Sequence, residues 1–185
     1  AAGPDVGAGT RAAALELATG VARERDDAAA KARIVARLAD LRPHGRVEAP
    51  AALDAKYRAA FVDFGIDVGG VDVTTAAQVI RADRARDALV DGLDDWMWMQ
   101  RRHRVPDANA WRRTIDLALG ADDDALRQQV REAVRADDAQ RLLEIAAVDA
   151  IANEPARSLV LLARGLAESE HRDEAIRVYR IASFR

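Results

Sequence analysis

The apolar residues of this chain recur at the spacing of an α-helix, and short segments rich in Gly, Pro or Asp interrupt them. No segment shows the sustained alternation of apolar and polar residues that is typical of a β-strand. Half of the residues are apolar, but only 4% are aromatic, and much of the apolar class is alanine. The sequence therefore predicts an all-α fold.

The expected organisation has three parts. Residues 1–49 comprise a flexible lead-in (1–9), a helical segment and a loop that contains Pro43 and Gly45. Residues 50–121 form a helical linker region. Residues 122–185 form two helical repeats, one degenerate and one truncated. The whole is expected to be an α-solenoid of antiparallel helix pairs that follows a helical N-terminal segment.

Residues 10–41 carry apolar side chains at a near-heptad spacing. The stripe consists of Leu17, Val21, Ala28, Val35 and Leu38. The polar residues Glu24 and Lys31 fall on the same stripe, which argues against a strong autonomous coiled coil. The segment is either one long helix or two shorter ones.

Start and stop signals predict where the later helices lie. The expected helices cover residues 51–64, a segment from Thr75, and residues 86–102, 109–119, 122–135, 137–152, 155–169 and 173 onward. Gly65 is expected to end the first of these in the left-handed conformation. Thr75 and Gln78 have the spacing of a capping box. Gly120 is expected to end the helix that Asn109 begins.

Residues 156–182 fit the tetratricopeptide template. Leu159, Leu162, Ala163 and Leu166 fill its first-helix core positions, and Ala175, Tyr179 and Ala182 fill those of its second helix. The preceding residues 123–155 match less well. Their candidate core residues are Val130, Leu143, Ala147 and Ala150, whereas Arg127 and Arg131 do not fit. The alternative is a generic helical hairpin, and the end at Arg185, before the terminal proline of the template, predicts a truncated repeat.

Charge and composition exclude several classes of function. The 28 basic and 31 acidic residues give a net charge of −3, so no global basic field would attract nucleic acid. The chain has no cysteine and no apolar run long enough to cross a membrane. No signal peptide is recognisable, and a cytoplasmic location is the default expectation.

No constellation of residues predicts a cofactor, a metal ion or catalysis. The three histidines, His44, His103 and His171, are scattered along the chain. Two triplets, Asp63-Phe64-Gly65 and His171-Arg172-Asp173, spell kinase motifs, but they occur in the reverse of the kinase order. The position that carries the magnesium-binding Asn in a kinase is Val178 here. We therefore expect the chain not to be an enzyme and to bind no cofactor.

The helix over residues 86–102 holds the candidate contact residues, Trp98, Arg101, Arg102 and Arg104. Its buried stripe is expected to contain Leu89, Leu93 and Trp96, with either Met97 or Gln100. Trp98 lies about 200° around the helix from Trp96. It is either exposed at an interface or covered by another segment. The arginines either bind a phosphate or an acidic partner or, the reading that we favour, complement the helix C-terminus.

Several segments together resemble one bacterial family. They are Lys56–Phe61, Phe64–Asp67, Ala76–Ile80, Leu93–Trp96, Ala110–Arg113, Ser158–Arg164 and Glu174–Ile176. In this order they resemble the region that follows the catalytic domain in eukaryotic-like serine/threonine kinases of planctomycete-type bacteria, where a linker leads into tetratricopeptide repeats. The sequence departs from that family at Met97, Trp98 and Met99.

The resemblance implies a non-catalytic scaffold that lies C-terminal to a kinase domain in a larger bacterial protein. Its implied partner is a protein or peptide that binds the concave groove of the repeats. No catalytic residue of the kinases has a counterpart in this chain. The alternative is a regulatory module that self-associates through residues 10–41. Neither hypothesis involves nucleic acid.

Overall fold

The computed structural model describes residues 6–41, 49–103, 105 and 107–184, with side chains from Leu15 onward. Every element in these ranges is helical, which confirms the all-α prediction. The α-helices are α1 (Val6–Leu41), α2 (Pro50–Asp63), α3 (Val73–Ala82), α4 (Arg86–Arg102), α5 (Ala110–Ala121), α6 (Ala125–Arg135), α7 (Ala139–Ala147), α8 (Ala156–Glu168) and α9 (Arg172–Ser183). A short 3₁₀ helix, η1 (Asp149–Asn153), separates α7 from α8.

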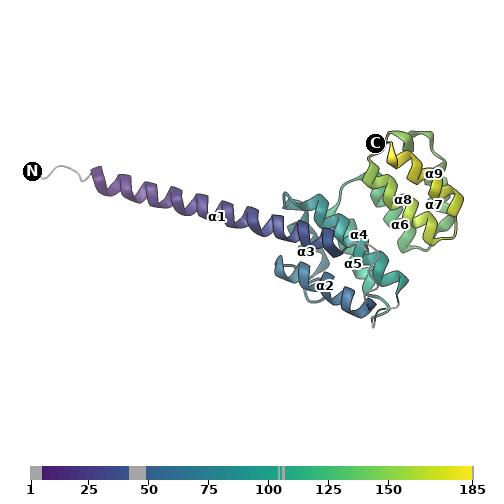
Figure 1. The fold of residues 1–185 in the computed structure, drawn as a ribbon, viewed down its shortest axis with the longest axis horizontal. Coiled ribbons are helices and arrows are strands. Elements are labelled where there is room, and N and C mark those ends of the chain that lie inside the picture. The colour runs from purple at the N-terminus through teal and green to yellow at the C-terminus, as the bar shows by residue number, and fades with distance from the viewer. Residues whose placement is uncertain (1–5, 42–48, 104, 106, 185) are drawn as a thin grey trace, which may run out of the picture.

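Helix α1 is a single continuous helix of 36 residues, which decides between the two readings of this segment. It is about 54 Å long at 1.5 Å per residue, and most of it extends away from the other helices as an arm (Figure 1). Only its C-terminal part packs on α2 and α4, where Ile34 and Leu38 are buried. The helix begins at Val6, so the predicted lead-in over residues 1–9 is too long. Residues 1–5 of that lead-in lie outside the described ranges.

Local signals account for most of the helix ends, with two corrections. Gly65 follows α2 with a φ of +93°, as predicted. Helix α3 is capped by Asp72, whose carboxylate accepts a hydrogen bond from the Thr75 backbone N–H at 2.9 Å. The predicted capping box is therefore wrong, because Thr75 already lies inside the helix. Gly120 also lies inside α5, which continues to Ala121.

The apolar residues form two cores that meet at α4. The first core lies among α1 to α5 and is centred on Trp96, which stacks on Tyr57 and Phe61 with ring centroids 6.0 and 5.6 Å away. The second core lies among α6 to α9 and takes in Met97 and Trp98. Successive residues of α4 thus face different cores, and this helix joins the two halves of the molecule.

Helices α6 to α9 form two neighbouring pairs, α6 with α7 and α8 with α9. Helix α6 contacts α7 and α8, α8 contacts α9, and α7 contacts both α8 and α9. The core positions predicted for α8 are all buried, and so are Ala175 and Ala182 of α9. Tyr179, in contrast, is 40% exposed, although it lies near Arg164 and Glu168 of α8.

The prediction for the preceding pair is confirmed at Val130 of α6, which is buried, but it is wrong in the helical phase of α7. Leu142, Ile145 and Ala146 form the buried face of α7, whereas Ala147 is exposed. Ala150 is also exposed and lies in η1, because α7 ends at Ala147 rather than at residue 152. The break after Ala147 changes the direction of the chain before α8 begins.

Candidate protein-interaction surface

Helix α4 carries a stripe of carboxylates on the side opposite Trp96. Asp87, Asp91, Asp94 and Asp95 recur at a helical spacing. Each pairs with an arginine of α6 or α8. The pairs are Asp87 with Arg157, Asp91 and Asp94 with Arg127, Asp94 with Arg131, and Asp95 with Arg164. Ion pairs therefore join α4 to both α6 and α8.

Two of these arginines, Arg127 and Arg131, are almost completely buried. Arg131 contacts both Asp94 and Asp122, with donor–acceptor distances of 2.8 Å. Arg127 Nη2 donates to Asp94 at 2.8 Å, and its Nε lies 2.9 Å from Asp122. A buried charge is costly unless it is paired. Here two guanidinium groups and two buried carboxylates neutralise one another.

Burial and pairing act in opposite directions on the pKa of each group. Burial raises the pKa of Asp122, but the guanidinium groups of Arg131 and Arg127 more than offset this and hold it below its usual value. Burial lowers the pKa of Arg131, but Asp94 and Asp122 raise it further than burial lowers it. For Asp91, burial has the largest effect and raises the pKa despite the neighbouring Arg127.

These ion pairs occupy the space between α4 and the helices α6 and α8. The arginines that did not fit the repeat template, Arg127 and Arg131, are the buried arginines of these pairs. A signal for the pairing was present in the sequence, since the acids of α4 and the arginines of α6 each recur at a helical spacing. The face that α6 and α8 turn toward α4 is occupied by the chain itself.

Trp98 is covered, which decides the question left open for this residue. Its side chain is 3% exposed, and its indole N–H has no hydrogen-bond partner in the described part of the chain. Arg101 lies over the rings of Trp98 and Trp111, 6.0 and 5.0 Å from their centroids. The Arg101 guanidinium also donates to the Val134 carbonyl at 2.8 Å and pairs with Asp137.

The other two candidate contact residues do not join Trp98 in one patch. Arg102 is exposed but pairs with Glu168 of α8 at 2.7 Å. Arg104 lies outside the described residues. The end of α4 thus uses Arg101 and Arg102 to contact the C-terminal helices.

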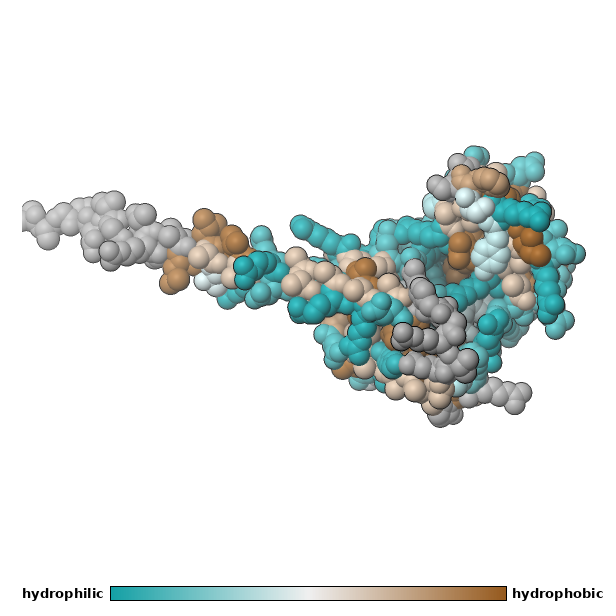
Figure 2. Space-filling view, in the orientation of Figure 1, coloured by the Kyte–Doolittle hydropathy of each residue, from teal (hydrophilic) through white to brown (hydrophobic). Residues whose placement is uncertain are grey.

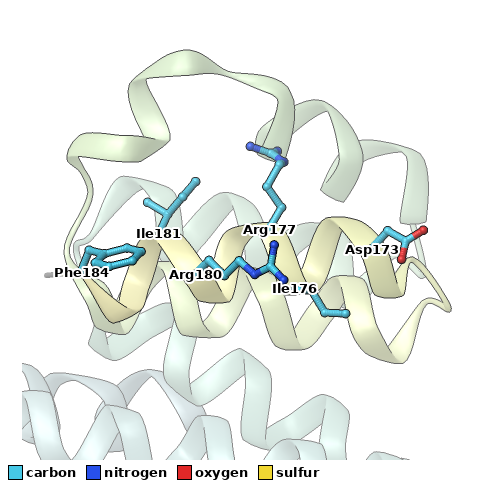
Figure 3. A pocket seen from close by; sticks show the side chains of 6 residues that line it. All are labelled: Asp173, Ile176, Arg177, Arg180, Ile181 and Phe184. Atoms are coloured by element: carbon cyan, nitrogen blue, oxygen red, sulfur yellow. The ribbon is translucent and has the colours of Figure 1, made fainter.

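The outer face of α9 is open, in contrast to the face that α6 and α8 turn toward α4. A hollow of about 510 Å³ lies along it (Figure 3). Its lining residues are Asp173, Ile176, Arg177, Arg180, Ile181 and Phe184. Ile176 is 49% exposed and Phe184 is 88% exposed. The opposite face of α9 packs inward through Ala175, Val178 and Ala182.

The charged residues of this face differ in their partners. Arg177 pairs with Glu174 at 2.7 Å and donates to the Ala146 carbonyl at 2.6 Å. The Arg180 guanidinium makes no hydrogen bond or ion pair with any residue that the structure describes, although the Arg180 backbone carbonyl accepts a hydrogen bond from the Ser183 hydroxyl. Asp173 lies at the other end of the helix (Figure 3). Arg180 is therefore a cation with no partner beside exposed apolar side chains.

The arm of α1 is a second open surface. Leu15 and Leu17 are each 70% exposed, and Val21 is also exposed. Figure 2 shows hydrophobic side chains on this arm and again over the C-terminal helices. In both of these places, large apolar side chains face solvent.

Among the described residues, no group of three or more His, Asp or Glu side chains is placed to hold a metal ion. Within the same ranges, no helix combines the length and the apolar character needed to cross a membrane. The two kinase-like triplets lie in separate places, one at the end of α2 and one at the start of α9.

No family model matches the chain, and no match was found among curated proteins or solved structures. Function is therefore inferred from the geometry of the molecule.

Proposed function

We propose that this chain is a non-catalytic protein-interaction module whose partner binds the outer face of α9. The observation that carries the proposal is Phe184, which is 88% exposed at the edge of a hollow that Ile176 and the partly buried Ile181 also line. Clustered apolar side chains that face solvent are typical of interaction sites. The face that α6 and α8 turn toward α4, in contrast, is occupied by ion pairs within the chain.

The proposal includes a tetratricopeptide-like arrangement of α6 to α9. In support, α6 contacts α8 and α7 contacts α9, which is the pattern that stacked helix pairs produce. The buried small residues Ala163 and Ala175 fit the close approach of α8 and α9. The outer face of α9 is not covered by any other element that the structure describes, and we assign it to a partner protein.

The resemblance to kinase-associated regions supplies the setting that we propose. The module would act in the bacterial cytoplasm as a scaffold, and it would hold a partner or substrate beside a kinase domain of the same protein. The ion pairs between α4 and the C-terminal helices would keep the α9 face in a fixed orientation. This setting rests on the resemblance and is testable separately from the binding face.

The experiment compares two double variants of the protein in its native cells. One carries Ile176→Asp and Phe184→Asp on α9, and the control carries Val62→Asp and Val79→Asp at exposed positions of α2 and α3. We expect the α9 variant to lose co-purifying partners that the control retains, with the same helix content by circular dichroism. The same partners for both variants would refute the proposal.

A second candidate function, self-association through the arm of α1, is favoured by the exposure of Leu17 and Val21. Deleting residues 1–49 is a poor test, because it would also remove Ile34 and Leu38 from the first core. Light scattering on Leu17→Glu is better, with Thr19→Glu on the opposite side of α1 as control. A dimer lost only in Leu17→Glu would support this candidate, and a monomeric parent would exclude it.

A further inference from the structure

We propose that the partner segment on α9 is an amphipathic helix whose apolar stripe is flanked by acidic side chains. This inference rests on the proposed function and specifies its ligand. It follows from the shape of the hollow, from the charge of its lining, and from the way in which the chain already holds an acidic helix of its own.

The shape of the hollow fits a helix better than an extended strand. Its lining residues run from Asp173 to Phe184 along one face of α9, a length of about 16 Å or three helical turns. An extended peptide gains affinity by pairing its backbone with a sheet edge, and a helix surface offers no such edge. A partner helix satisfies its own backbone and needs only apolar side chains at i, i+3 and i+7 to contact Ile176, Ile181 and Phe184.

The charge of the lining favours carboxylates on the partner. Two arginines, Arg177 and Arg180, face one carboxylate, that of Asp173, which lies at the other end of the face. Glu174 already pairs with Arg177, so of these two arginines it is Arg180 whose guanidinium has no partner among the described residues. Arginine binds carboxylates through a planar fork of donors. An acidic side chain of the partner, placed beside Phe184, would therefore pair with Arg180.

Inside the molecule, arginines already bind an acidic helix in this way. Helix α4 presents Asp91, Asp94 and Asp95 to arginines of α6 and α8, while Met97 and Trp98 enter the apolar core between them. Arginines from the C-terminal helices thus hold an acidic helix whose neighbouring residues are apolar. The outer face of α9 repeats this combination of arginines and apolar side chains, with solvent in place of the acidic helix.

The test uses two synthetic helical peptides of about 18 residues with the same leucine stripe. One carries Glu at the flanking positions and the other carries Lys. Fluorescence anisotropy measures their binding to the whole chain. We expect the Glu peptide to bind about tenfold more tightly than the Lys peptide, and Arg180→Glu to remove that preference. Arg81→Glu is the matched control, because Arg81 is exposed and also lies in the last turn of its helix.

Three outcomes would overturn the inference. The first is binding of the Lys peptide that equals or exceeds that of the Glu peptide. The second is binding of neither peptide. In either case the proposed function still stands if the α9 double variant loses partners in cells. The third is a concentration-dependent dimer in sedimentation that Phe184→Asp abolishes, because a second copy of the chain would then occupy the face.

Discussion

Arg131 binds Asp94 through two parallel hydrogen bonds, from Nε to Oδ1 and from Nη2 to Oδ2, each 2.8 Å long. The pair is buried and joins α6 to α4, and therefore joins the C-terminal helices to the rest of the fold. Bidentate pairs of this kind combine strength with a fixed geometry. Two apolar cores meet at α4, and the orientation of one relative to the other depends on this contact.

Removal of Arg131 should strongly destabilise the protein. In Arg131→Met, Asp94 and Asp122 would keep Arg127 as their remaining buried guanidinium, and breaking a buried pair costs about 3–5 kcal/mol. The control is Arg135→Met, which removes an exposed pair with Asp116 and should change the free energy of unfolding by less than about 0.5 kcal/mol. Urea unfolding followed by circular dichroism measures both, and equal losses would contradict the prediction.

The carboxylates Asp122 and Asp91 should change the free energy of unfolding in opposite directions as the pH falls. The folded-state pKa of Asp122 lies below its usual value, so its charged form contributes stability above about pH 3.9 that is lost as the pH falls through the folded pKa. The folded-state pKa of Asp91 is raised by burial. Its contribution to stability therefore falls as the pH rises above about 3.9 toward that value.

Asp122→Asn should therefore be more destabilising than Asp91→Asn at neutral pH. The Asp122 side chain is also the more buried of the two, at 4% against 30% exposure. Urea midpoints measured between about pH 3 and pH 6 should fall less steeply with acid in Asp122→Asn than in the parent. The prediction is wrong if Asp91→Asn shows the larger loss at neutral pH.

Helix positions were predictable from the sequence because their signals are local. The predicted bounds of α4 match the structure, and the left-handed Gly65 ends the turn after α2 as expected. The buried phase of α8 also follows from its apolar spacing. Each of these features depends on side chains within a few residues of one another.

The features that sequence reasoning missed depend on contacts between distant segments. Arg127 and Arg131 were mismatches to an apolar template, and their acidic partner Asp94 lies 33 and 37 residues away. Trp98 lies on the acidic side of α4 and is buried because α6 to α9 cover that side. A helical wheel shows which residues share a face, but it does not show which faces another element will cover.

Replacement by phenylalanine should destabilise the protein more at Trp96 than at Trp98. Trp96 Nε1 donates to Asp54 at 2.7 Å, whereas the Trp98 N–H has no partner in the described structure. Both side chains are buried, so alanine at either position should cost about 3–5 kcal/mol. Trp96→Phe should be the more destabilising phenylalanine variant, by about 1–2 kcal/mol, because it also removes a hydrogen bond to a carboxylate.

Unfolding midpoints in guanidinium chloride, followed by far-UV circular dichroism, can compare the four tryptophan variants. The fluorescence of the remaining tryptophans gives a second probe of the same transition. A larger loss for Trp98→Phe than for Trp96→Phe would show that the bond to Asp54 contributes little to stability.

Helix α9 should open more readily than α4 and α5. It packs inward through three small or medium side chains, Ala175, Val178 and Ala182, and leaves Phe184 in solvent. An exposed Phe forgoes about 1.5–3 kcal/mol of burial, which is a large share of a typical stability of about 5–15 kcal/mol. Segments with an open face and few buried contacts exchange their amides through local opening.

Hydrogen exchange followed by mass spectrometry should therefore show residues 172–184 exchanging before residues 86–102 and 110–121. Helix α4 provides the contrast, because one side packs in the first core while the other side pairs with α6 and α8. Arg131→Met should speed exchange in α4 and α6 by weakening that pairing. Exchange in α9 as slow as in α4, in a sample that sedimentation shows to be monomeric, would mean that the inward face of α9 alone supplies enough stability.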